Sequence, residues 1–505
     1  MQTSPYPGSA LDEDESAALQ RAEAAVSSLL ESRRDRWYPT FHIAPVAGWI
    51  NDPNGLVFHD GRYHVYFQHN PYGSVWDTIH WGHVSSADLV HWSREPIAIA
   101  PSIEGEADGV FSGSATVDDE GRIVVLYTGH EWNDRDDFSK GGRARQILAS
   151  SVDGERFTKH GVVIEQPEGI RQIRDPKVWR EGALWHLVIG AEAADGRGEV
   201  WLYTSADLVE WTREGTLYRS PDEHVVMLEC PDFFPLGDRW VLVVSPMGLR
   251  PDGHRFRNLN DSGYVVGTWA PGQPFVVEHE FRPLDGGANF YAPQSFEAPD
   301  GRRILIGWMG TFQNTLASQP EDGFAGQHTI LRELSLTDAG LVAERPIAET
   351  AALHRDAVDF GAFELGADEH RVLLEDAPAL DVEVVFDLDR TTAERFGFAV
   401  AKTPSGRETM VAVDAQTQHL VVDRRHGAGE GGYRAVPVPA SGELSLRILV
   451  DRSSVEVFIG DGVEAVSSLI FPDAGPRALE LFAECGGASV TRLVVHRMAG
   501  VYADR

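Results

Sequence analysis

The segment DGRYHVYFQH (60–69) decides the fold, because four similar segments follow it along the chain. In each one, a turn containing Gly leads into an apolar run with the residues and length of a β-strand. The first run starts at residue 63, and the later ones, IVVLYTG, LWHLVIG, WVLVVSP and RILIGWM, start at 123, 184, 240 and 303. The starts are therefore 60, 61, 56 and 63 residues apart. A period of about 60 residues with several strands in each unit predicts a five-bladed β-propeller.

A second repeat supports the same fold. The segment SSADLVHW (85–92) recurs as TSADLVEW (204–211), with the weaker SSVDGERF (150–157) between them. The alternative is an ordinary multistranded sandwich in which separate hairpins resemble one another, and the two repeats argue against it.

The repeat stops near residue 355. Beyond it, DVEVVFDLD, LSLRILVD, SSVEVFI, ALELFAE and TRLVVHR alternate between apolar and polar residues. Such alternation is typical of strands in an antiparallel sandwich. We therefore predict an all-β chain with a helical extension over 1–40, a five-bladed β-propeller over 41–350 and an antiparallel β-sandwich over 355–505. We expect a structural role for the sandwich, with sugar binding as the alternative.

Residues 16–34 predict a short N-terminal helix. Leu19, Ala22, Val26, Leu29 and Leu30 recur at helical spacing and give the segment one apolar face. We expect this face to pack on the body of the protein, and a contact between two copies of the chain is the alternative. The oligomeric state is not readable from the sequence.

The composition limits the partners. The chain of 505 residues has 44 basic and 77 acidic side chains, which gives a formal charge of −33. This charge argues against nucleic acid and anionic membranes and fits a neutral substrate. Two cysteines, Cys230 and Cys485, are too few for a disulfide framework or a zinc site. No apolar run reaches the roughly 18 residues of a membrane span, and the acidic N-terminus lacks the apolar core of a secretory signal, so we expect a cytoplasmic protein.

Three acidic residues take similar places in the repeat. Asp52, Asp175 and Glu229 lie 11, 9 and 11 residues before the apolar runs of their units, and Ser112 and Tyr291 take similar places in the other two. Because equivalent positions in a propeller form a ring around its channel, we expect the three acids to meet at one mouth of that channel. Carboxylates that meet resist ionising together, so at least one pKa should be raised, which suits an acid and a nucleophile at one pH.

Glycoside hydrolysis needs such a pair of carboxyl groups. Aromatic residues that could stack on sugar rings flank the three acids: Trp49, Trp76, Phe111, Tyr291 and Trp308. The alternative is that Asp52 and Asp175 are turn residues before proline and that Glu229 is solvated at a blade edge. The similar repeat positions of all three acids argue against this alternative.

Six motifs, in order, resemble those of glycoside hydrolase family 32, which includes invertases, sucrose-6-phosphate hydrolases and fructan hydrolases. They are WINDPNG (49–55), FSGSA (111–115), RDP (174–176), ECPD (229–232), FYAPQ (290–294) and GWMG (307–310). The segment ILVDRSSVEVFIGDG (448–462) resembles the signature of the sandwich appended in that family. The resemblance extends from about residue 41 to the end of the chain and implies a five-bladed propeller followed by a sandwich.

The resemblance also implies roles for individual residues. Asp52 matches the nucleophile, Glu229 the acid/base, and Asp175 the acid that holds fructosyl hydroxyls and stabilises the transition state. Further positions match those that line the fructose pocket: Asn51, Gln68, Trp76, Phe111, Ser112, Arg174, Tyr291 and Trp308. No cofactor and no metal are expected.

The expected activity is that of a retaining β-fructofuranosidase acting on sucrose, sucrose 6-phosphate or short fructo-oligosaccharides. Retention predicts that the carboxyl groups of Asp52 and Glu229 lie about 5–5.5 Å apart. Two other functions stay open: fructosyl transfer by the same residues, and a carbohydrate-binding propeller without catalysis, which the set of three acids disfavours.

Some segments depart from the family pattern or invite a separate interpretation. Asn289 stands where many bacterial members have Asp, while FAG (324–326) and TILREL (329–334) replace the usual Trp-Arg-Gly and TLPREL, so the leaving-group preference stays open. The loop RPDGHRFR (250–257) could bind a substrate phosphate through Arg250, His254, Arg255 and Arg257, although a basic surface loop is the favoured interpretation. His80 and His83 have ligand-like spacing without a second cluster nearby, which disfavours a metal site. We expect Cys230 to be packed rather than reactive.

Overall fold

The computed structural model describes residue 6 and residues 13–137, 140–427 and 431–502. In the first part of the chain, five antiparallel sheets follow one another, each with four main strands in sequence order. The predicted apolar runs form the second strand of each sheet. These runs are apolar throughout because a strand that is buried on both faces contacts apolar neighbours on each of them.

The strands of these sheets have the following bounds. The first sheet contains β1 (Gly48–His59), β2 (Arg62–Asn70), β3 (His80–Ser86) and β4 (Trp92–Ile99). The second contains β5 (Gly109–Val117), β6 (Ile123–Trp132), β7 (Gly142–Ser151) and β8 (Thr158–Glu165). The third contains β9 (Gln172–Glu181), β10 (Leu184–Glu192), β11 (Gly198–Ser205) and β12 (Thr212–Arg219). The fourth contains β13 (Met227–Leu236), β14 (Arg239–Met247), β15 (Gly263–Thr268) and β16 (Val276–Pro283). The fifth contains β17 (Tyr291–Glu297), β18 (Arg303–Met309), β21 (Arg332–Leu336) and β22 (Val342–Pro346), and β20 (Gln327–His328) also pairs with β18.

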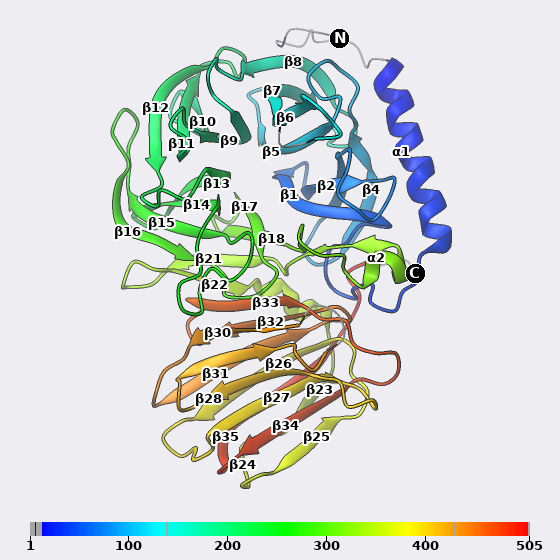
Figure 1. Ribbon diagram of the computed structural model, residues 1–505, viewed down its shortest axis with the longest axis vertical. Helices are drawn as coiled ribbons and strands as arrows, with labels where there is room; N and C mark the ends of the chain where they lie inside the picture. The colour runs from blue at the N-terminus through cyan, green and yellow to red at the C-terminus, as the bar shows by residue number, and fades with distance from the viewer. Residues whose placement is uncertain (1–5, 7–12, 138–139, 428–430, 503–505) are drawn as a thin grey trace.

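The five sheets form a closed ring, the propeller predicted from the repeat (Figure 1). Their first strands contact one another in the order β1, β5, β9, β13 and β17, and β17 contacts β1 again. Ile50, Leu56 and Val65 of the first sheet share an apolar core with Ile304 and Ile306 of the fifth. A short strand, β19 (Phe324–Ala325), pairs in parallel with the start of β1 and joins the end of the ring to its beginning.

The last part of the chain forms two packed antiparallel sheets, the predicted β-sandwich. A 3₁₀ helix (Ala348–Leu353) leads into it from β22. One sheet contains β23 (His354–Asp359), β24 (Phe363–Leu365), β26 (Leu380–Asp387), β31 (Glu443–Val450), β32 (Ser454–Ile459), β33 (Glu464–Leu469) and β35 (Ala488–Met498). The other contains β25 (His370–Leu374), β27 (Arg395–Lys402), β28 (Thr409–Asp414), β29 (His419–Asp423), β30 (Tyr433–Pro437) and β34 (Ala478–Glu484).

The core of the sandwich explains the alternating sequence. Val382, Val384 and Phe386 of β26 point inward at every second position and pack with Phe396 and Phe398 of β27. The division of the chain at residues 40, 350 and 355 stays a prediction, and expression of the separate segments is its test.

A buried network of charges joins the propeller to the sandwich. Arg332 of β21 lies 3.1 Å from Asp285 and 3.0 Å from Glu344, and it also pairs with Glu456 of β32. The His42 ring lies between Asp451 and Glu456, at 2.8 Å from a carboxylate oxygen of each. Asp451 and Glu456, both in the segment 448–462, thus bind charged groups of the propeller. Charges that are this deeply buried need partners, so these contacts join the two parts of the chain.

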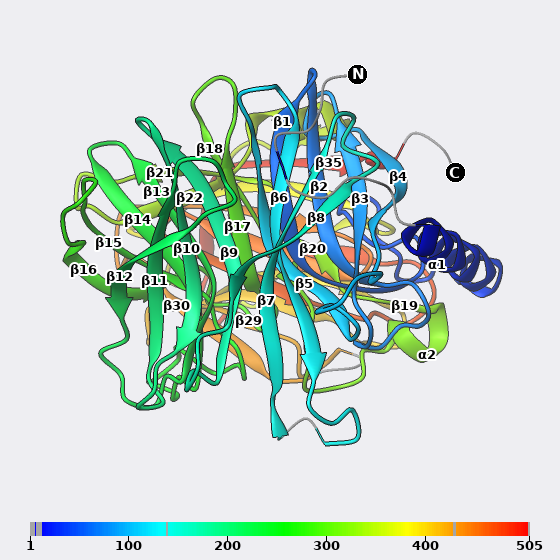
Figure 2. The same cartoon turned by 90° about the horizontal axis from the view of Figure 1, so that it is seen from above.

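The predicted N-terminal helix is present as α1 (Glu13–Ser32) and lies along the edge of the ring beside β4 (Figure 2). Leu19 and Ala22 are buried against Ile97 and Ala100, so the prediction that its apolar face packs on the body is confirmed. Leu30, at the other end, is 42% exposed. A second helix, α2 (Ser318–Asp322), precedes β19. Neither helix has the length and apolar character needed to cross a bilayer within the part of the chain that the structure describes.

Candidate active site

Each first strand of the ring is interrupted at the residues predicted to carry chemistry. The pairing with the second strand shifts register after Ile50, Val110, Arg174, Glu229 and Tyr291. Such β-bulges leave residues unpaired and re-aim side chains. The NDPNG and ECPD motifs are therefore bulges within strands, where they turn polar side chains toward the channel, rather than turns between strands.

The bulges also correct the predicted equivalence of the three acids. In the last three sheets, Asp175, Cys230 and Ala292 occupy the same position, each with a positive φ (67°, 48° and 48°) and each before proline. Glu229 precedes that position, as Arg174 and Tyr291 do in their own strands. The acids therefore meet at one mouth of the channel, as predicted, but from different register positions, which counting from the apolar runs cannot resolve.

Asp52 is buried, and both of its carboxylate oxygens accept hydrogen bonds. The Ser112 hydroxyl donates to Oδ2 at 2.6 Å, and the Asn51 amide donates to Oδ1 at 3.1 Å. Asn51 also donates to Gln68 at 2.9 Å, and Gln68 in turn donates to Ser112. Burial raises the pKa of Asp52, while the hydrogen bonds from Ser112 and Asn51 lower it. The carboxylate is thus fixed in direction by its own neighbours in the bulges.

Glu229 is held at both oxygens by residues of the same register position. The Arg174 guanidinium donates to Oε1 at 2.9 Å, and the Tyr291 hydroxyl donates to Oε2. Burial raises the pKa of Tyr291 well above its ordinary value, and the charge of Glu229 adds to the effect, so the phenol stays a donor. These contacts come from the third and fifth sheets, on either side of the fourth, which carries Glu229.

Asp175 lies deep in the same site. Its Oδ2 accepts a hydrogen bond from the Cys230 backbone N–H at 2.9 Å. Burial raises the pKa of Asp175 to about 7; Arg174 opposes the rise, and the charges of Glu229 and Asp52 add to it. The predicted raised pKa among the three acids is therefore present.

The Cys230 thiol lies between two of the acids. Its Sγ is 3.4 Å from Asp52 Oδ2 and 3.6 Å from Asp175 Oδ2. Burial raises the pKa of this thiol well above its ordinary value, and both carboxylates raise it further, so Cys230 is a neutral donor rather than a nucleophile.

These side chains line a cavity of about 670 Å³ at the mouth of the channel. Of the predicted residues, the cavity wall includes Asn51, Asp52, Gln68, Trp76, Phe111, Ser112, Arg174, Asp175, Glu229 and Tyr291. Trp308 does not line this cavity. It is buried against Trp49 and Phe312, with ring centroids 5.7 and 4.7 Å away, and Phe312 takes its place at the wall.

Sequence reasoning missed two rings, His130 and Trp132, which line the cavity beside the predicted Phe111. The rings of His130 and Phe111 are stacked, with centroids 4.5 Å apart, and Trp132 packs edge-on against His130. Burial lowers the pKa of His130 to about 3, with a contribution from Arg174, so the ring is neutral. His130 and Trp132 lie at the end of β6, the second strand of its sheet. The letters HEW directly after an apolar run were the signal in the sequence that could have identified them. Neutral flat rings of this kind offer apolar faces to a sugar.

The other sequence features lie elsewhere. Arg255 pairs with Asp252, and none of the four basic side chains of the loop 250–257 lines the catalytic cavity. His80 contacts the Thr78 carbonyl at 3.1 Å, and His83 contacts His64 at 3.0 Å. Among the described residues, no group of three or more His, Cys, Asp or Glu side chains is placed to hold a metal ion.

The segments that depart from the family pattern form contacts near the second domain. Asn289 accepts a hydrogen bond from the Leu469 N–H at 2.9 Å and donates to the Gly310 carbonyl at 3.1 Å, so it bridges the fifth sheet and the sandwich. The FAG segment contains β19, which closes the ring.

Family models cover nearly all of this architecture. Residues 42–346 match the N-terminal domain of glycosyl hydrolases family 32, and residues 349–497 match the C-terminal domain of that family. The chain belongs to glycosyl hydrolase family 32. The family resemblance inferred from the motifs is confirmed, and the cavity lies in the part that matches the N-terminal model.

Individual members of family 32 are similar over most of their length. A sucrose-6-phosphate hydrolase of Escherichia coli is 42% identical over 471 residues, which cover 93% of this chain and 97% of that protein. A raffinose invertase of Escherichia coli is also 42% identical, over 94% of this chain and 98% of that protein. A Bombyx mori GH32 β-fructofuranosidase mutant, solved in complex with sucrose, superposes with a TM-score of 0.86 at 32% identity and covers 98% of this chain and 100% of its own.

Proposed function

We propose that this family 32 glycoside hydrolase is a retaining β-fructofuranosidase that cleaves the terminal β-fructofuranosyl bond of sucrose or sucrose 6-phosphate. The observation that carries the proposal is the meeting of Asp52, Glu229 and Asp175 on one cavity, each held by named donors. The names of the relatives, sucrose-6-phosphate hydrolase and raffinose invertase, and the sucrose bound in the Bombyx mori structure support the substrate class.

In the first step, Asp52 attacks the anomeric carbon of the fructosyl unit. The bond from that carbon to the leaving oxygen breaks, and the Glu229 carboxyl gives its proton to this oxygen. A covalent fructosyl-Asp52 ester forms. The carboxyl separation of about 5–5.5 Å that this mechanism requires stays a prediction.

In the second step, water cleaves the ester. Glu229, now a carboxylate, takes a proton from the water as its oxygen attacks the anomeric carbon, and Asp52 leaves as the carboxylate. Arg174 and Tyr291 each donate to an oxygen of the Glu229 carboxyl group, which orients that group for this step. We expect Asp175 to accept hydrogen bonds from fructosyl hydroxyls and so to hold the substrate while Asp52 reacts.

The test compares the wild type with Asp52→Asn, which keeps the shape of the side chain and removes its charge. Fructose release from sucrose and from sucrose 6-phosphate should fall by about 10⁴-fold or more, as for other removed nucleophiles. Asp300→Asn, the same exchange on the turn after β17, is the matched control and should keep full activity. A folded wild type that releases no fructose from either sugar would end the proposal.

The stereochemistry is tested separately. With methanol as the acceptor, a retaining enzyme gives methyl β-fructofuranoside, and an inverting enzyme gives the α-anomer. Transfer to a second sugar would use the same residues, and no contact of the described residues favours it. A cytoplasmic location stays a prediction, which cell fractionation would test.

A further inference from the structure

The guanidinium of Arg174, which donates to Glu229, is itself held from its other side. Its Nε and Nη2 atoms each lie 2.9 Å from Glu229 Oε1. The remaining corner of the group, Nη1, donates to the side-chain oxygen of Gln172. Because a guanidinium is rigid and planar, holding one corner also fixes the direction of the opposite edge. Gln172 therefore helps to keep that edge on Glu229.

The Gln172 amide can face Arg174 in one way only. Arginine has donors and no acceptor, so the atom of Gln172 that faces Arg174 is its oxygen. The NH2 end of the same amide then points toward the neighbouring strand β10. There it donates to Oε2 of Glu192 at 2.7 Å. The amide thus has a partner at each end.

Glu192 holds the far end of this row of contacts. It lies in β10 directly opposite Gln172 in the pairing of β9 with β10, where side chains of paired residues meet. Glu192 is only 4% exposed, and its Oε1 accepts a hydrogen bond from Arg171 at 3.2 Å. Both of its oxygens therefore face donors, and the carboxyl group is a fixed acceptor for the Gln172 amide.

A second carboxyl group competes for Arg174. Asp175 Oδ2 lies 4.0 Å from Arg174 Nε, compared with 2.9 Å for Glu229 Oε1. A guanidinium that is not held at Nη1 is free to turn from Glu229 toward Asp175. The contact with Gln172 thus decides which of the two acids Arg174 binds.

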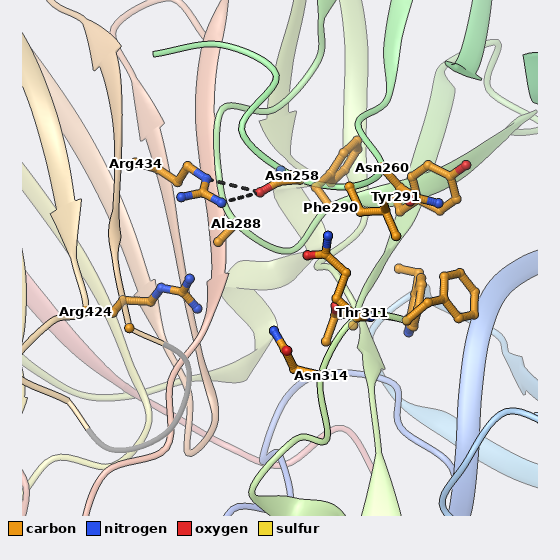
Figure 3. A pocket seen from close by; sticks show the side chains of 15 residues that line it. Asn258, Asn260, Ala288, Phe290, Tyr291, Thr311, Asn314, Arg424 and Arg434 are labelled. Atoms are coloured by element: carbon orange, nitrogen blue, oxygen red, sulfur yellow. Dashed lines mark hydrogen bonds between the residues drawn. The ribbon is translucent and has the colours of Figure 1, made fainter. Parts of the chain in front are cut away.

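The other oxygen of Glu229 is held independently of these contacts. Tyr291 donates to Oε2, and this tyrosine is buried. It lines both the catalytic cavity and a second cavity of about 190 Å³ next to it. Figure 3 shows Tyr291 beside Asn260 and Phe290 on the wall of that second cavity. Loss of the Gln172 contact should therefore release Oε1 while Oε2 stays held, so the carboxyl group turns but does not leave the site.

We propose that Gln172 and Glu192 are positioning residues of the fructosidase, which hold Arg174 on Glu229 and so aim the Glu229 carboxyl group at the leaving oxygen. This inference rests on the proposed function, in which Glu229 gives its proton to that oxygen. Neither residue takes part in the transfer of the proton. Their effect reaches the leaving oxygen through Arg174 and Glu229.

The test compares kcat/KM for sucrose with kcat/KM for 4-nitrophenyl β-fructofuranoside. A sugar oxygen is a strong base and needs the proton of Glu229 to leave, whereas 4-nitrophenolate is a weak base and leaves with little help. Gln172→Leu should lower kcat/KM for sucrose about tenfold, because a hydrogen bond to a charged group is lost. It should lower kcat/KM for the nitrophenyl fructoside by about twofold or less.

Variants of Glu192 test the far end of the contacts. Glu192→Gln keeps an acceptor oxygen for the Gln172 amide, so it should retain more activity on sucrose than Glu192→Leu, which keeps none. Glu181→Gln, at the opposite end of β9, is the matched control for Glu192→Gln and should leave both kcat/KM values unchanged.

Crystal structures of the wild type and of Gln172→Leu test the positioning without turnover. Arg174 should take one orientation, toward Glu229, in the wild type, and should turn toward Asp175 or take two orientations in the variant. This result would support the positioning even if the wild type hydrolysed no fructoside, which would end the proposed function alone.

Three results would overturn the inference and leave the proposed function intact. The first is an equal fall in kcat/KM for both substrates, which would show that Gln172 and Glu192 only support the cavity wall. The second is an unchanged kcat/KM for sucrose in Gln172→Leu. The third is a crystal structure of Gln172→Leu in which Arg174 keeps its single orientation on Glu229.

Discussion

His42 should make the stability of the protein depend on pH between neutral and alkaline conditions. Its ring is buried with Asp451 and Glu456 at 2.8 Å on either side. Burial opposes the charge, but the hydrogen bonds to the two carboxylates outweigh it and raise the pKa of His42 from 6.5 to about 9. The folded state therefore binds the proton more tightly than the unfolded chain does.

The magnitude follows from the two pKa values. A difference of about 2.5 pKa units corresponds to about 3 kcal/mol of stability. Because the folded pKa is the higher one, this contribution is fully present below pH 6.5 and is lost as the pH rises through 9. The interaction is shared with Asp451 and Glu456 and is counted once.

The perturbation is His42→Gln, and the assay is urea unfolding from pH 6 to pH 10, followed by tryptophan fluorescence. The variant should be less stable than the wild type at pH 6, and the difference should shrink by about 3 kcal/mol by pH 10. His83→Gln is the control, because burial lowers the pKa of His83 well below its ordinary value and the ring carries no charge in this range. A His42→Gln deficit that is constant from pH 6 to pH 10 would refute the reasoning.

Two further predictions concern the catalytic cavity. Ser112→Ala removes the hydroxyl that donates to Asp52 at 2.6 Å and lowers its pKa, so the acidic limb of the kcat/KM profile should move up by about one pH unit; an unmoved limb would show that Asp52 does not control it. Cys230 is buried and Cys485 is exposed, so a thiol reagent should modify one cysteine in the native protein and two in urea, and rapid modification of both in the native protein would contradict the described packing.

The sequence was sufficient for the architecture because repeats of apolar runs report burial directly. Five runs with similar spacing led to the ring, and the alternation beyond residue 355 led to the sandwich. The helix was found from its apolar spacing, although it begins at Glu13 and ends at Ser32 instead of covering 16–34.

The fine geometry of the site was not predictable from residue counting. A bulge changes which residue faces the channel without changing the apolar pattern, so Glu229 was aligned with Asp175 although it shares its position with Arg174 and Tyr291. The motifs placed Trp308 at the pocket; in the structure its ring packs against Phe312 and lines the cavity next to the catalytic one. Motifs report identity, and the exposure of a ring depends on what packs over it.

The contacts between the domains left no signal in the sequence either. Arg332 and Glu456 are 124 residues apart in the chain, and isolated charged residues in strands usually face solvent. Only the folded arrangement shows that these charges meet in the interior.

The closure of the ring sets the order in which this enzyme becomes active during synthesis. Ile50, Leu56 and Val65 of the first sheet are covered by Ile304 and Ile306 of the fifth. During synthesis, the apolar side chains of the first sheet that pack against the fifth therefore stay exposed until most of the propeller has been made. Because exposed apolar surface promotes aggregation, we expect chaperones to bind the nascent chain at this stage. Asp52 is among the first site residues to be synthesised and Tyr291 is among the last. We therefore expect the chain to become active in one late step of synthesis, and not gradually as it lengthens.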